Sequence, residues 1–306
     1  MSQTKAMAFV KPSNDVRNFR IFASVVLTVI TILTLLPILL IIIASFTDET
    51  TLLATGYSFF PAKLSTDAYY YMVRQGSTIL RAYGITIFVT VVGTVCSIVM
   101  TTAIAYPMSR KDFRFRGALS FFVFFTMLFN GGVVSAYIMW TRIFSIRDTI
   151  LALIIPNYLM GAFNIFLVRN YYENAIPTAL IESAQIDGAS EFTVFLRIML
   201  PLAIPTIATV ALFTALAYWN DWTNGLYYIT DTSLYGIQNL LIRIMNNIQF
   251  LKSSSNAALL GTQTVDLPGT SVRMALAVVG ILPILIIFPF AQKYFVKGVV
   301  LGAVKG

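Results

Sequence analysis

Long apolar runs dominate the sequence and restrict the folds that it can adopt. Residues 21–45, IFASVVLTVITILTLLPILLIIIAS, contain no Asp, Glu, Lys or Arg. An α-helix rises about 1.5 Å per residue, so about 20 residues cross the roughly 30 Å hydrocarbon core of a bilayer. Other segments of the chain meet or nearly meet this length. We therefore expect six transmembrane helices, at residues 21–45, 82–106, 118–140, 150–168, 201–219 and 271–291.

Few charged residues interrupt these runs. Hydrophobic residues make up 58% of the 306 residues and charged residues 11%, against about 25% charged residues in soluble proteins. Such a composition leaves too little polar surface to cover a soluble core. We therefore expect an all-α, polytopic membrane protein that crosses the bilayer several times and contacts lipid.

The sequence lacks the side chains on which many catalytic and metal sites depend. It contains no histidine, which removes His-based metal sites and Ser-His or Cys-His nucleophilic pairs. Cys96 is the single cysteine, so no disulfide framework forms within the chain. We expect no catalytic residue, no metal site and no cofactor bound by this chain.

The Lys and Arg residues indicate how the helices are oriented. Cytoplasmic loops of membrane proteins carry an excess of Lys and Arg. If both termini are cytoplasmic, 13 of the 21 Lys and Arg residues fall inside and 8 outside, although the outside loops are longer. The net charge of +8 is then a topology signal, and we expect no nucleic-acid partner.

One short interval of charged residues stands apart from the apolar runs. Residues 181–201, IESAQIDGASEFTVFLRIMLP, lie in the longest expected cytoplasmic loop and include Glu182 and Asp187. Small side chains at three- and four-residue spacing predict a helix that ends near Asp187. Gly188 stands where a helix often ends in a left-handed residue, and Ser190 can cap a second helix.

This helix-turn-helix has two interpretations. It is either a connector that lies on the membrane surface or a docking element for a soluble partner. A helix on a membrane surface favours Lys and Arg on its polar face, but neither occurs between Arg169 and Arg197. A short helix that carries small side chains and carboxylates fits a groove on a partner protein. We favour docking.

The same stretch resembles the signature of permease subunits of type I ATP-binding-cassette (ABC) importers. The matching residues are Glu182, Ala184, Asp187, Gly188, Ala189, Phe195, Ile198, Leu200 and Pro201. The usual pattern has two alanines after the glutamate, and this chain has Ser183 at the first position. Other stretches resemble the carbohydrate-uptake branch and its oligosaccharide subgroup: YPMSRKDFRFRG at 106–117, NGGVVSAY at 130–137, YWNDW at 218–222 and the ending YFVKGVVLGAVKG.

The resemblance implies a role for each part of the chain. Residues 1–20 would be a cytoplasmic amino end, 21–80 the first transmembrane helix and an outside loop, 81–291 a core of five helices, and 292–306 a cytoplasmic tail. Within the core, the loop at 173–200 would carry a coupling helix that contacts a cytoplasmic ATPase. The implied coupling residues are Glu182, Ser183, Ala184, Asp187, Gly188 and Ala189.

The resemblance also implies partners in a bacterial plasma (inner) membrane. These are a second, homologous permease subunit in a heterodimer, a cytoplasmic ATPase dimer, an extracellular solute-binding protein and a sugar or oligosaccharide substrate. A phosphate-binding loop needs G-x-x-x-x-G-K-[ST], but the only lysine followed by Ser or Thr is Lys252, and Leu251 precedes it. The chain is therefore not expected to be an enzyme, and ATP and Mg would be used by the partner ATPase.

Polar and aromatic residues near the expected spans are candidates for the substrate pathway. The glycines after Asn130 interrupt the third span, which fits either close helix packing or a loosened helix beside a cavity. Asn157 and Asn164 are seven residues apart in the fourth span and would share a face. Aromatic rings can stack on sugars, although an aromatic belt at the membrane interface is the alternative. The candidates are Asn130, Gly131, Gly132, Tyr137, Asn157, Asn164, Trp219, Asn220 and Asp221.

Three other functions compete with sugar import. The first is an ABC permease for a non-sugar solute. The second is a secondary transporter driven by an ion gradient, which needs ionisable residues deep in its spans; the expected spans contain almost none. The third is a membrane-embedded enzyme, for which this sequence offers no set of catalytic groups.

Overall fold

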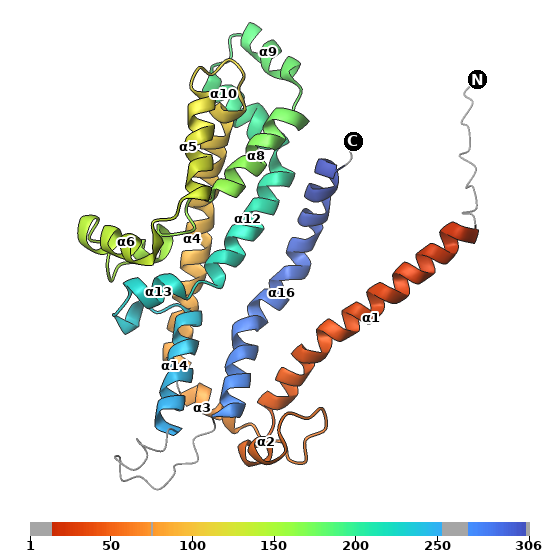
Figure 1. Ribbon diagram of the computed structural model, residues 1–306, viewed down its shortest axis with the longest axis vertical. Helices are drawn as coiled ribbons and strands as arrows, with labels where there is room; N and C mark the ends of the chain where they lie inside the picture. The colour runs from red at the N-terminus through yellow and green to blue at the C-terminus, as the bar shows by residue number, and fades with distance from the viewer. Residues whose placement is uncertain (1–13, 75, 253–268, 304–306) are drawn as a thin grey trace. The chain divides into compact units, whose positions relative to one another are not determined.

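The protein is described by a computed structural model that places residues 14–74, 76–252 and 269–303 (Figure 1). Residues 1–13 of the expected amino end and 304–306 of the expected tail lie outside the described residues, as do 253–268 of the last outside loop. The regular secondary structure of the described residues is helical, and their β-type pairing is limited to an isolated bridge between Thr47 and Leu64. It divides into two compact units, residues 1–71 with 266–278, and residues 72–265 with 279–306.

The first unit contains the helix expected from the longest apolar run. Helix α1 spans Asn14–Ser45 and contains the whole expected span 21–45. Only Ala44 and Ser45 are buried along it, so its apolar side chains are free to face lipid. At its end, Ser45 Oγ lies 2.8 Å from the hydroxyl of Tyr69, a residue of α3 (Asp67–Arg74).

A carboxylate in the same unit caps the N-terminus of α16 (Thr270–Ala303). Glu49 is the first residue of α2 (Glu49–Thr55). The Glu49 carboxylate accepts hydrogen bonds from the backbone N–H groups of Thr270 (2.8 Å) and Ser271 (2.8 Å) and from Ser271 Oγ (2.9 Å). These N–H groups have no partner within their own helix, and a negative charge is favourable at that end.

Helix α4 (Gly76–Ser109) is the axis of the second unit and packs against α8 (Ala162–Ala175) and α12 (Ile204–Trp219) (Figure 1). Close approach depends on small residues, as is usual between helices in a membrane. A Cβ on Gly93 of α4 would lie 2.5 Å from the ring of Tyr218 on α12. The buried core where these helices meet includes Ala105, Ile165 and Val210.

The third expected span, 118–140, is not one helix. Helix α5 (Arg116–Leu128) is followed by α6 (Gly132–Ile138) and the π-helical turn η1 (Met139–Ile143), and the pair is bent by 115°. Asn130 Oδ1 accepts a hydrogen bond from the Gly132 N–H at 2.8 Å, and Gly132 has a φ of +79°. This side-chain turn competes with the helix, and glycine makes the left-handed conformation accessible.

The fourth expected span, 150–168, is also divided. Helix α7 covers only Leu151–Ile154, and α8 begins at Ala162. Between them Asn157 has a φ of +69°, a conformation that asparagine tolerates and that ends a right-handed helix. The expectation that Asn157 and Asn164 share a helix face is therefore wrong, because the helix is broken between them.

A bend of 78° between residues 191–202 and α12 lies near the start of the fifth expected span, 201–219. The bent part comprises α10 (Glu191–Val194), the π-helical turn η2 (Phe195–Met199) and α11 (Leu200–Leu202). Beyond α12 lie α13 (Thr223–Tyr228), the 3₁₀ turn η3 (Thr232–Leu234) and α14 (Ile237–Lys252).

The described helices differ in their ability to cross a bilayer alone. Helices α1 and α4 are long and apolar enough, and up to four spans result if each bent pair counts as one. Residues 270–286 of α16 form a shorter apolar helix. The all-helical membrane architecture is thus present, with breaks that a search for uninterrupted apolar runs does not detect.

Candidate functional site

The charged stretch that stands out in the sequence forms a short helix, a tight turn and a second helix. Helix α9 spans Thr178–Ile186 and begins directly after Pro177. Gly188 follows with a φ of +81°, and the N–H of Ala189 donates to the carbonyl of Ala184 at 2.9 Å. This is the Schellman arrangement, in which a left-handed glycine ends the helix and satisfies its last carbonyls. Ser190 Oγ then accepts from the Thr193 N–H at 3.3 Å and caps α10.

One side of α9 is anchored and the other is exposed. Ile181 is 5% exposed and belongs to the core that also contains Val194 and Met199. Ala184 and Ala189 are half-buried against the same core. Packing on this side therefore fixes α9 to the body of the unit.

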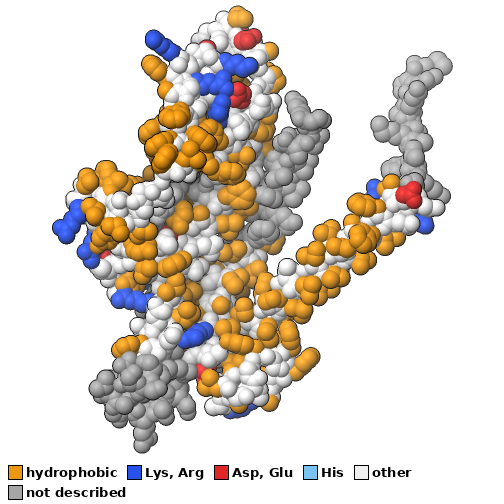
Figure 2. Space-filling view, in the orientation of Figure 1, with side chains coloured by type: hydrophobic (Ala, Val, Ile, Leu, Met, Phe, Trp, Pro, Cys, Tyr) orange, Lys and Arg blue, Asp and Glu red, His pale blue; other side chains and the backbone are white. Residues whose placement is uncertain are grey.

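The rest of the α9 surface carries the other residues expected to couple, and Glu182 among them also borders the cavity described below. Glu182, Ser183, Asp187 and Gly188 are exposed, and Ile186 beside them is 86% exposed. Among the described residues, the carboxylates of Glu182 and Asp187 have no hydrogen-bond or ion-pair partner. Figure 2 shows Lys, Arg, Asp and Glu side chains gathered at the α9 end of the unit. Two free carboxylates next to a large exposed apolar side chain are suited to bind another protein.

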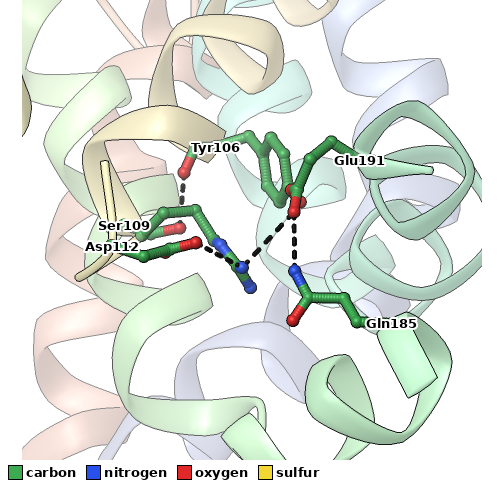
Figure 3. Close-up of polar contacts among 6 residues, drawn as sticks. Tyr106, Ser109, Asp112, Gln185 and Glu191 are labelled. Atoms are coloured by element: carbon green, nitrogen blue, oxygen red, sulfur yellow. Dashed lines mark hydrogen bonds and ion pairs between the residues drawn. The ribbon is translucent and has the colours of Figure 1, made fainter. Parts of the chain in front are cut away.

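A second group of polar residues links this turn to α4 and was not anticipated from the sequence. Gln185 Nε2 donates to Glu191 Oε1 at 2.7 Å, and the Tyr106 hydroxyl donates to Glu191 Oε2 (Figure 3). Arg110 Nη2 lies 3.5 Å from Glu191 Oε1 and 2.9 Å from Asp112 Oδ2. We call Tyr106, Arg110, Gln185 and Glu191 the Glu191 junction.

The sequence indicated the contacts of the Glu191 junction only indirectly. Arg110 belongs to the basic stretch MSRKDFRFRG at 108–117, which the positive-inside rule predicts to be a cytoplasmic turn. Its partner Glu191, however, lies 81 residues further along the chain. No local spacing rule connects residues at that separation. Their contact follows from the packing of the α9–α10 turn beside the end of α4.

An ion-pair cluster ties three helices together near the same end. Glu173 of α8 pairs with Arg116, the first residue of α5, and with Arg169 at 3.2 Å. Arg169 Nε also donates to the carbonyl of Met108 at 3.1 Å, close to the end of α4. A cation that binds the last carbonyls of a helix complements the helix dipole.

A cavity of about 300 Å³ lies between α9, α8 and the turn at 109–112. Its walls include Arg110 and Gln185 from the Glu191 junction and Glu182 from α9. Because this space is not filled by side chains, α9 does not pack directly on the 109–112 turn there.

The residues predicted to line a substrate pathway do not form one group. Trp219 is 6% exposed, and its Nε1 donates to the Gly280 carbonyl at 3.4 Å. Asn220 is exposed and bonds its own helix through the Leu216 carbonyl at 2.9 Å. Asp221 Oδ1 accepts from the backbone N–H groups of Thr223 (3.0 Å) and Asn224 (3.2 Å). Burial raises the pKa of Asp221, although these hydrogen bonds oppose that shift.

Two asparagines on the list have partners within the unit. Asn157 Nδ2 donates to Oδ1 of the fully buried Asn224 at 2.8 Å, and Asn224 Nδ2 donates to the Pro156 carbonyl at 3.1 Å. Asn164 Nδ2 lies 3.4 Å from Thr214 Oγ1. Asn157, Asp221 and Asn224 therefore meet where the α7–α8 break contacts α13. The sequence did not predict that Asn157 pairs with Asn224, because the two residues are 67 positions apart.

The remaining pathway candidates lie around the bend after α5. Asn130, Gly131 and Gly132 are exposed. Tyr137 of α6 stacks on Tyr228 of α13, with ring centroids 6.2 Å apart.

Long apolar helices, with breaks stabilised by polar side chains, are typical of a membrane protein. Residues 93–301 match the family of binding-protein-dependent transport system inner membrane components. Because this match covers well over half of the chain, the protein belongs to that family. It is a membrane component of an ABC transporter and not the ATPase itself.

Similar proteins include permeases whose names state a carbohydrate cargo. The chain is 38% identical to protein LplC of Bacillus subtilis over 265 residues, which cover 87% of each chain. It is 36% identical to the polygalacturonan/rhamnogalacturonan transport system permease protein YtcP of the same organism, over 87% of this chain and 90% of the relative. These matches confirm the expected resemblance to ABC permeases of the oligosaccharide subgroup.

The fold is also similar to that of a solved structure. A chain from the crystal structure of a bacterial ABC transporter involved in the import of the acidic polysaccharide alginate superposes with a TM-score of 0.77 at 28% sequence identity. The superposition covers 94% of this chain and 99% of that chain. The breaks in the third and fourth expected spans are thus compatible with an ABC importer permease fold.

Proposed function

We propose that this chain forms half of the translocation pathway of an ABC importer for a sugar or oligosaccharide, and that α9 couples it to a separate cytoplasmic ATPase. The observation that carries the proposal is the exposed side of α9. Glu182 and Asp187 are free of intramolecular partners among the described residues, and Ile186 is 86% exposed, while Ile181 anchors the helix from behind. A helix built in this way has a face available for a partner and a fixed connection to the core.

The sugar assignment rests on the relatives. YtcP is named for polygalacturonan and rhamnogalacturonan transport, and the structural neighbour is involved in alginate import. A non-sugar cargo is the alternative, and it would leave the permease assignment intact. An ion-driven mechanism is disfavoured by the scarcity of ionisable residues in the expected spans.

The proposed assembly contains a second, homologous permease in a heterodimer, an ATPase dimer that uses ATP and Mg, and an extracellular solute-binding protein. The chain would cross the inner membrane six times, with both termini in the cytoplasm. Residues 1–20 and 292–306 would then be the cytoplasmic ends, 21–80 the first span with its outside loop, and 81–291 the core containing the 173–200 loop. This orientation places α9 on the ATPase side.

Coupling would work by alternating access between two states. ATP binding would bring the two ATPase subunits together, and their grooves would carry the coupling helices with them. Each ligand shifts such an equilibrium only by its different affinity for the two states. ATP and the loaded binding protein would both favour the outward-open state, and hydrolysis would restore the inward-open one.

The candidates for the substrate pathway differ in exposure and in their hydrogen bonds. Asn130, Gly131, Gly132 and Asn220 are exposed, and Tyr137 and Asn164 are half-buried, so these side chains or backbone groups can border a cavity. Trp219 is buried, and the Asp221 carboxylate accepts hydrogen bonds from the backbone N–H groups of Thr223 and Asn224. Asn157 is exposed, and its amide donates to the buried Asn224. We propose that Trp219 and Asp221 shape the pathway from behind, whereas the exposed Asn157 can border it.

The first test is Asp187→Arg in the complex reconstituted with the sister permease, ATPase and binding protein. A bulky cation on the exposed side of α9 should abolish ATPase co-purification and the stimulation of ATP hydrolysis by loaded binding protein. Short oligomers of galacturonic acid, of alginate and of arabinose serve as probes. Asp15→Arg is the matched control, because Asp15 is an exposed carboxylate in the first turn of α1 and undergoes the same change of charge.

The outcomes separate the parts of the proposal. Unchanged co-purification and stimulation in Asp187→Arg would show that α9 is only a connector. Stimulation of the intact complex by a non-sugar solute alone would overturn the sugar assignment. Uptake by this chain without its ATPase would exclude the ABC mechanism.

A further inference from the structure

The attachment of α9 leaves one direction of movement weakly restrained by packing. Ile181 is the buried side chain of α9, and the cavity separates the helix from the 109–112 turn. A force on the exposed side of α9 would therefore tilt it about Ile181 before it moved the core. On the cavity side, Gln185 and Glu191 carry the contact to α4.

The other end of the Glu191 junction is firmly held. Tyr106 lies in the last turns of α4, and its ring packs against Phe195 at a centroid distance of 5.3 Å. Arg110 directly follows α4, and its side chain is only 12% exposed. Because α4 packs along α8 and α12, a displacement of Tyr106 and Arg110 moves the end of α4 relative to these two helices.

The junction is poorly suited to a purely stabilising role. The Glu191 side chain is 54% exposed, and exposed ion pairs contribute little to folding stability. Its two carboxylate oxygens nevertheless accept hydrogen bonds from different elements. Oε1 accepts from Gln185 of α9, and Oε2 accepts from Tyr106 of α4. This geometry defines the orientation of α9 relative to α4.

We propose that Glu191 is a positioning residue that converts displacement of α9 into displacement of α4. The proposal rests on the proposed function, because it requires the ATPase to act on α9. When the ATPases close, Gln185 moves with α9, and Glu191 transmits the movement to Tyr106 and Arg110. Without the carboxylate, α9 tilts in place while α4 stays behind.

The test is Glu191→Ala in the full reconstituted complex. We expect ATPase co-purification and basal ATP hydrolysis to be retained, and stimulation by loaded binding protein to fall about fivefold or more, the lower end of typical allosteric coupling. Asp112→Ala is the matched control, since Asp112 also pairs with Arg110 but does not contact α9. It should leave stimulation unchanged.

Each result has a distinct meaning. Loss of co-purification in Glu191→Ala would make Glu191 part of the docking face and overturn the inference. Retained stimulation would also overturn it, while the coupling role of α9 would still be judged by Asp187→Arg. In a double-mutant cycle, Arg110→Ala combined with Glu191→Ala should reduce stimulation by less than the product of the two single reductions. A reduction equal to that product would contradict a shared junction.

A distance measurement tests the mechanical step without relying on activity. Cys96, the chain's single cysteine, is exposed on α4 and supplies one label site. Because Ile186 belongs to the proposed docking face, the second label is placed instead on Ala179→Cys, an exposed position in the first turn of α9 outside the coupling residues. With cysteine-free partners, paired spin labels in the intact junction should give a narrow distance distribution that ATP does not change. In Glu191→Ala the distribution should broaden or shift on ATP binding. An identical, ATP-independent distribution in the variant would exclude Glu191 as the rigid link.

Discussion

Gly93 sets how closely α4 and α12 approach each other. Its position faces the ring of Tyr218, whose hydroxyl donates to the Ile154 carbonyl at 2.7 Å. Tyr218 is 2% exposed, so its ring is held inside the packed core. The single missing Cβ therefore fixes both the helix spacing and the position of a buried tyrosine.

We expect Gly93→Ala to destabilise the protein by about 1–3 kcal/mol, the usual cost of overpacking a dense core. Gly84→Ala is the matched control, because Gly84 lies on the same helix and a Cβ there would meet no atom within 4 Å. Thermal inactivation of the purified complex should show a lower midpoint for the first variant only. Equal midpoints would mean that Tyr218 can adjust its position.

At the scale of elements, the start of α16 depends on a carboxylate from another helix. The sequence gives no hint of this contact, because Glu49 and Thr270 are 221 residues apart. The Glu49 carboxylate accepts hydrogen bonds from the first N–H groups of α16, which an N-cap residue of the same helix usually does. It thereby joins α2 to the last apolar helix of the chain.

Glu49→Ala should loosen the first turn of α16, at a cost of about 0.5–2 kcal/mol by analogy with lost N-caps. Hydrogen exchange at the amides of Thr270 and Ser271 should become faster. In Glu49→Gln the exchange rate should lie between the rates of Glu49→Ala and of the intact protein. Leu53→Ala, on the exposed side of α2, controls for changes in that helix. Unchanged exchange at both amides in Glu49→Ala would show that they do not depend on the carboxylate.

The turn after α9 shows how far local rules reach. Gly188 and Ser190 were expected to end one helix and cap the next, and both do so. These expectations succeed because capping depends on residues within a few positions of each other. The Glu191 junction and the Asn157–Asn224 pair were missed because their partners come from distant segments.

At the scale of the whole molecule, the distribution of Lys and Arg predicts both termini and the basic turn at 108–117 in the cytoplasm. In a Cys96→Ser background, a membrane-impermeant thiol reagent applied to whole cells should label Thr232→Cys. It should label Lys111→Cys only after permeabilisation. Both positions are exposed, so access is decided by the membrane, and the reverse pattern would refute the topology.

The sequence by itself determined that the chain is helical, lies in a membrane and carries one charged turn unlike the rest. Apolar runs and capping residues report these properties because they act through the local chain and through transfer into lipid. Tertiary structure decided where the third and fourth spans break, which asparagines pair, and how α9 is tied to α4. Those features arise from contacts between residues far apart in sequence, where a buried polar group is stable only beside the partner that folding brings to it.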